Sequence, residues 1–161
     1  MDISTVKKGY YNNTKRFKQA AEGISTDEAF FRPFDKANSL IWEIGHTNFF
    51  RNTIIKLLNP TEQLTVFPHE KDLFGFGSQT ADASAYPSLA EVLESFEQRG
   101  NRIGELLDTT TAEHLASESP YKVAVLGATV GQQIFSLLIH EANHYGELNY
   151  VKTLIHRLRG L

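Results

Sequence analysis

The chain has 161 residues, of which 41% are hydrophobic and 22% charged, and its formal net charge is −3. This size and balance are typical of one globular domain, so we expect residues 1–161 to form a single domain. With this net charge the chain has no excess of basic charge to attract nucleic acid or anionic lipid, and no segment approaches the roughly 20 apolar residues of a membrane span.

The first half of the chain predicts two helices. Apolar residues three, four or seven apart indicate a first helix over about residues 2–22, and Gly23 provides its stop. A second helix opens between residues 35 and 39 and runs to Leu58, where the sequence Asn59-Pro60 ends it.

The second half predicts two more helices and two long connections. Ser88 with Glu91 three positions later forms a capping-box pattern that starts a third helix, and a fourth runs over about residues 128–159. Residues 59–87, rich in Gly, Pro, Ser and Asp, separate the second helix from the third, and residues 117–127 separate the third from the fourth. Four helices with such connections predict an all-α four-helix bundle with a crossover between its second and third helices.

Histidines occupy positions where an inward helix face should be apolar. The inward stripe of the fourth helix reads Leu137, His140, His144, Leu148, Val151, Ile155 and Leu158. The stripe of the second helix reads Trp42, His46, Phe49, Thr53 and Leu57. His140 and His144 are four residues apart, so their side chains lie one above the other on the same face.

These three histidines predict a metal site. One inward histidine alone is commonly a hydrogen-bonded core residue, but three buried imidazoles need partners that an apolar interior does not offer. A single metal ion bound to His46, His140 and His144 satisfies three nitrogens at once. The chain contains no cysteine, so the ligands must be nitrogen or oxygen atoms, and imidazoles suit zinc or nickel.

The other three histidines are predicted to be solvent-exposed. His69 lies in the long connection beside acidic residues, and His114 and His156 lie off the apolar stripes. The sequence therefore places them outside the metal site.

Two other metal-dependent classes share parts of this pattern. His140-Glu141-Ala142-Asn143-His144 spells the HExxH signature of zinc peptidases, although the Gly and third His of its extended form do not follow. Glu43-x-x-His46 and Glu141-x-x-His144 match di-iron carboxylate bundles, which also need an inward Glu on the first and third helices. The candidates there, none of which lies on an apolar stripe, are Glu22, Glu94, Glu97 and Glu105.

Trp42-Glu43-Ile44-Gly45-His46, followed by an aromatic-rich helix, and His140-Glu141-Ala142-Asn143-His144-Tyr145-Gly146-Glu147 resemble the DinB/YfiT-like superfamily. The resemblance covers nearly the whole chain. It implies a four-helix bundle with up-down-down-up topology, often dimeric, with His46, His140 and His144 as metal ligands. Many members use a low-molecular-weight thiol such as bacillithiol or mycothiol in transferase or isomerase reactions, and many others have no known activity.

One position departs from the pattern of that family, because Glu147 stands where a Gln is usual. Glu147 faces the same side as the two histidines and is a candidate for orienting a ligand imidazole or for approaching the metal. Glu141 is turned about 100° from His140 and is expected to be solvated. Gly146 is expected to allow a close helix approach.

These features lead to a hypothesis of a metal-dependent thiol S-transferase. Three ligands leave a coordination position open, where an exogenous thiol could be held as the thiolate, and an electrophile could rest against Trp42, Phe49 and Phe50. A non-catalytic metal-binding stress or structural protein, and a hydrolase that uses metal-bound hydroxide, remain the alternatives. The absence of cysteines and of a signal peptide favours a cytoplasmic protein, and the resemblance implies a homodimer.

Overall fold

The computed structural model describes residues 2–160 and, within them, contains helices and loops without any strand. Its backbone pairing outside helices includes one isolated bridge between Glu118 and Thr129. The all-α class predicted from the sequence is confirmed. The helices are α1 (Ile3–Ala21), α2 (Thr26–Ala29), α3 (Leu40–Leu58), α4 (Glu70–Phe74), α5 (Leu89–Thr109), α6 (Ala112–Ala116) and α7 (Val130–Leu158), with 3-10 turns η1 (Ala83–Ala85) and η2 (Ala124–Leu126).

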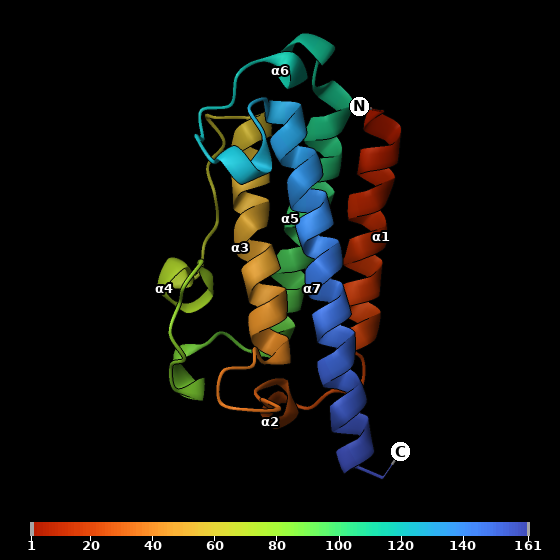
Figure 1. The fold of residues 1–161 in the computed structure, drawn as a ribbon, viewed down its shortest axis with the longest axis vertical. Coiled ribbons are helices and arrows are strands. Elements are labelled where there is room, and N and C mark those ends of the chain that lie inside the picture. Colours follow the sequence, from red (N-terminus) through yellow and green to blue (C-terminus); the bar gives the residue numbers. More distant parts are fainter. Residues whose placement is uncertain (1, 161) are drawn as a thin grey trace.

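Four long helices, α1, α3, α5 and α7, build the body of the molecule (Figure 1). In the view of Figure 1, α1 and α7 run downward, whereas α3 and α5 run upward. Both α1 and α3 pack against α5 and α7, so α5 and α7 lie between them. No helix of the described residues is long and apolar enough to cross a membrane.

Local capping explains where the long helices begin. The Ser88 side chain accepts a hydrogen bond from the Glu91 amide and the Glu91 carboxylate accepts one from the Ser88 amide, so the predicted capping box is present. Thr129 and Gln132 form the same arrangement before α7. The predicted helix limits agree with the observed ones to within a few residues, and α3 starts at the late limit of its expected range.

The interior consists of two apolar clusters with polar side chains between them. One cluster includes Phe17, Ile41 and Phe96, and the other includes Tyr10 and Ile54 among its members. On each long helix a buried polar residue lies between the residues that belong to the two clusters. These polar residues are Asn13, Arg51, Arg99 and Glu141. The predicted stripe of α7 is wrong at its last residue, because Leu158 is exposed beyond the end of the apolar cluster.

The connection between α3 and α5 packs against α3 through α4. Leu73 and Phe74 of α4 are buried in the first apolar cluster. Gly45 makes this possible, because a Cβ at that position would collide with the Phe74 ring. The long connection therefore contributes core residues next to the histidine of α3.

Candidate metal centre

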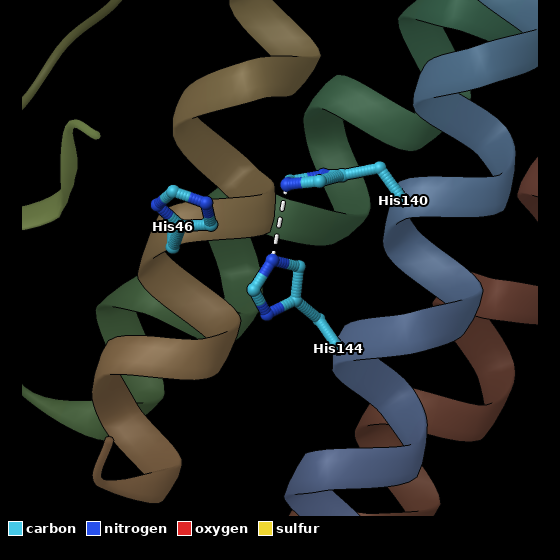
Figure 2. A group of neighbouring side chains, drawn as sticks. All are labelled: His46, His140 and His144. Atoms are coloured by element: carbon cyan, nitrogen blue, oxygen red, sulfur yellow. Dashed lines mark hydrogen bonds between the residues drawn. The ribbon is translucent and has the colours of Figure 1, made fainter. Parts of the chain in front are cut away.

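The structure brings His46 of α3 together with His140 and His144 of α7 (Figure 2). Their ring nitrogens lie within 4.8 Å of one another, and the Nε2 atoms of His140 and His144 are 3.0 Å apart. His46 is buried, and the other two side chains are partly buried. Three imidazoles from two helices thus converge where the sequence placed a metal site.

Two of the imidazoles are held by hydrogen bonds at Nδ1. His46 Nδ1 lies 2.7 Å from the main-chain oxygen of Phe74, and His144 Nδ1 lies 2.5 Å from a carboxylate oxygen of Glu43. Both acceptors require the proton on Nδ1, so in the neutral imidazole the Nε2 lone pair is free. This is the tautomer that a metal ligand needs, and the outer partner also fixes the ring orientation.

His140 completes the cluster differently. Among the described residues its buried Nδ1 has no hydrogen-bond partner, while its Nε2 faces the Nε2 of His144. Two nitrogens that share a tetrahedral zinc ion at 2.0–2.1 Å are about 3.3 Å apart, close to the separation seen here. The donor set and its spacing therefore fit a divalent metal ion.

Burial keeps His46 and His140 neutral. Loss of solvation lowers the pKa of His46 to about 4 and that of His140 to about 3, and His144 adds a smaller repulsive contribution at both. Neutral imidazoles at physiological pH are available as ligands without first losing a proton. Burial also raises the pKa of Glu43, and the hydrogen bond from His144 opposes that effect.

Glu43 is a residue whose role the sequence reasoning missed. It is 1% exposed and its carboxylate accepts a hydrogen bond from His144 Nδ1. The sequence assigns Glu43 no role beyond its place in the Glu-x-x-His pattern and in the family motif. The predicted candidate, Glu147, is farther away, 3.8 Å from the same nitrogen, with a side chain 58% exposed. Glu43, His144 and Glu147 form a second grouping whose ligand atoms could hold a metal.

Glu141 does not lie in solvent as the sequence predicted. It is 1% exposed and forms an ion pair of 2.7 Å with Arg51, and Asn13 donates a further hydrogen bond to it. The prediction failed because the partner, Arg51, lies on another helix and is itself fully buried. With both carboxylate oxygens engaged inside the bundle, Glu141 is not placed as the general base of a zinc peptidase.

The predicted aromatic wall lies against the histidines in two of its three positions. Trp42 stacks on His46, with ring centroids 4.4 Å apart, and its indole N–H donates to Ser78. Phe50 contacts His46 and His140 edge-on, with centroids 4.9 and 5.0 Å away. Phe49 lies beyond, against Phe50.

The remaining histidines and acids stand apart from the cluster. His69 is exposed, as predicted, but His114 is half-buried because its Nε2 bonds to the main-chain oxygen of Leu57, 2.8 Å away. His156 is also half-buried. None of the four acids considered for a di-iron site points inward: Glu22, Glu94 and Glu105 are exposed, and Glu97 pairs with Lys18.

Gly146 does not serve a close helix contact. A Cβ built at this position meets no atom of the described residues within 4 Å. The expectation of tight packing there is wrong, because this part of α7 faces outward.

Comparison with known proteins gives a family and a fold. The profile of the DinB superfamily matches residues 10–148. A crystal structure of a conserved protein from Enterococcus faecalis is similar at 16% sequence identity with a TM-score of 0.71, covering 96% of each chain. At that identity the likeness concerns the fold alone. The search of curated proteins found no match.

Proposed function

This chain belongs to the DinB superfamily, and from that premise we propose that His46, His140 and His144 bind one divalent metal ion, zinc or nickel. We propose further that the protein is a metal-dependent thiol S-transferase that uses a low-molecular-weight thiol. The observation that supports both steps is the convergence of three imidazoles, two of them already oriented through Nδ1.

The chain's own residues prepare this centre for an added ligand. The Glu43 carboxylate and the Phe74 carbonyl fix two imidazole rings in the folded protein, so binding a metal requires little new ordering. Three nitrogen ligands leave at least one coordination position open. A divalent cation held there supplies one chemical effect, a lowered pKa for a coordinating thiol.

The transfer itself needs no protein nucleophile. The chain has no cysteine, so the sulfur comes from the exogenous thiol. Its proton passes to solvent, the sulfur forms a bond to an electrophilic carbon, and the leaving group departs with the electrons of the bond that breaks. Trp42 and Phe50 shield the histidines from water on two sides, and we assign to the exposed Glu147, 3.8 Å from His144 Nδ1, a minor supporting role beside Glu43.

Elemental analysis of purified protein tests the metal site. The expected result is about one equivalent of zinc or nickel in the wild type and in the exposed-histidine control His69→Ala, and loss of the metal in His144→Ala. Absence of metal from all three proteins, even after reconstitution, contradicts the proposal.

A second experiment separates the transferase from its alternatives. Metal-loaded protein should consume an electrophile only when a thiol such as bacillithiol is added, and His144→Ala should not. Turnover without thiol identifies a hydrolase instead. A protein that loses stability without metal, yet turns over in neither assay, is a structural metal-binding protein.

The helix topology, the oligomeric state and the location of the protein are proposed from its family. We propose that the four long helices are the up-down-down-up bundle of the family, and that the protein is a cytoplasmic homodimer. Light scattering after size-exclusion chromatography checks the dimer, which should show twice the chain mass of 18.1 kDa.

A further inference from the structure

A cavity of about 560 Å³ lies beside the histidine cluster. Phe49 and Phe50 of α3 form one wall, and Lys71, Asp72 and residues 75–79 form the other. Phe50 is common to both places, because it also contacts the rings of His46 and His140. The volume lies within the range typical of small-molecule sites.

The lip of this cavity carries Phe76, whose side chain is 94% exposed. Both of its neighbours must be glycine. A Cβ on Gly75 would collide with the carbonyl oxygen of Lys71, and Gly77 has φ of 75°, which side chains disfavour. The backbone therefore holds the Phe76 ring in solvent, although burying its apolar surface would lower the free energy of the folded protein.

One end of the lip is hydrogen-bonded to His46, and the other to Trp42, which stacks on His46. On one side the Phe74 carbonyl accepts a hydrogen bond from His46, and on the other the Ser78 hydroxyl accepts one from Trp42. The three residues between these anchors, 75–77, are a short glycine-flanked segment. Rotation about the Cα–Cβ bond of Phe76 can move the ring without disturbing either anchor or the hydrogen bond that the Ser78 amide donates to the Gly75 carbonyl.

We propose that this cavity binds the flat apolar part of the electrophilic substrate and that Phe76 closes over it. The inference rests on the proposed function, because it names the substrate class of that site. Phe49 and Phe50 line a space that accommodates a ring-sized group, Phe76 stands at its lip, and offset or edge-on contacts of phenyl rings with such a group are favourable.

Trp42 provides a built-in reporter, because it is the single tryptophan of the chain and is bonded to Ser78 of the lip. The probe is N-phenyl-1-naphthylamine, a neutral aromatic fluorophore titrated against metal-loaded wild-type protein with energy transfer from Trp42 as the signal. Saturable binding at about one site is expected. Phe76→Ala should weaken it roughly five- to tenfold through loss of one aromatic contact, whereas Phe34→Ala, a change at a Phe that is also largely exposed, should leave it unaltered.

The outcomes separate this inference from the metal proposal. Equal affinity in Phe76→Ala and the wild type, equal weakening in Phe34→Ala, or no saturable binding by a protein that holds its metal each overturns the inference. The same titration on His144→Ala provides a further readout. Saturable, Phe76-dependent binding there supports the cavity even if elemental analysis has refuted the metal site.

Discussion

The Arg51–Glu141 ion pair and the histidine cluster are two polar regions between the same apolar clusters, yet their bonding differs. Arg51 donates to both carboxylate oxygens of Glu141 and to the Phe96 carbonyl, and Asn13 also donates to Glu141. This network involves all four long helices, and its charges are paired within the chain. At the histidines, the buried Nδ1 of His140 has no partner among the described residues, and the Nε2 atoms of His140 and His144 lie 3.0 Å apart. A buried polar group with its partners inside the chain has a structural role, whereas a buried polar atom without a partner indicates a missing ligand.

The largest expected effect comes from breaking the ion pair. Arg51→Met leaves the Glu141 carboxylate buried without its cation and should lower the free energy of unfolding by about 3–5 kcal/mol. Urea denaturation measures this loss, which should be the same with or without added zinc. The double variant Arg51→Met/Glu141→Leu should recover part of it, and failure to recover any contradicts the pairing argument.

Metal binding at the histidines should raise the free energy of unfolding of the whole protein without changing the contribution of the Arg51–Glu141 ion pair. At a free zinc concentration 100 times the dissociation constant, binding to the native state adds about 2.7 kcal/mol to the free energy of unfolding. A rise in melting temperature on zinc addition should therefore occur in the wild type and in His69→Ala, and be absent from His144→Ala. An equal rise in all three proteins would show that zinc binds elsewhere.

The metal-free protein should lose stability in acid through the same histidines. The folded-state pKa values of His46 and His140 lie near 4 and 3, below the ordinary value of 6.5, so the unfolded chain binds more protons as the pH falls below 6.5. Stability is thus complete above pH 6.5 and declines toward pH 4. Between pH 7 and pH 5 we expect the free energy of unfolding measured by urea denaturation to fall by about 2 kcal/mol. This figure already includes a reduction for the partial exposure of His140. His140→Ala should show about half that dependence, and an unchanged dependence would exclude His140 as a source.

A further effect concerns the orientation of His144. Glu43→Gln keeps the shape but replaces the carboxylate acceptor, and should weaken zinc binding roughly ten- to a hundredfold in a competition titration. Glu147→Gln, a matched change at the exposed carboxylate, should alter the affinity by less than about threefold. A larger loss in Glu147→Gln than in Glu43→Gln would reverse the assignment of the orienting residue.

Local patterns predicted the helices and the histidine cluster, because both depend on spacing along one segment. The Ser88 capping box and the four-residue interval between His140 and His144 are visible in the sequence itself. The burial of Glu141 and the role of Glu43 depend on partners 90 and 101 positions away, and no periodicity reports such contacts. A clue was present in α3, where the charged Arg51 lies between the apolar pairs Phe49-Phe50 and Ile54-Ile55.

The hydrogen bond that orients His46 differs from that of His144 in how mutation can remove it. Its acceptor is the main-chain oxygen of Phe74, which every amino acid carries, so a substitution at position 74 changes the ring packed on Gly45 but not the acceptor itself. The Glu43 carboxylate is lost in a single codon change. Random mutation therefore affects the two orienting hydrogen bonds unequally. A substitution of Glu43 removes the one to His144, whereas the one to His46 is lost only when α4 no longer packs against α3.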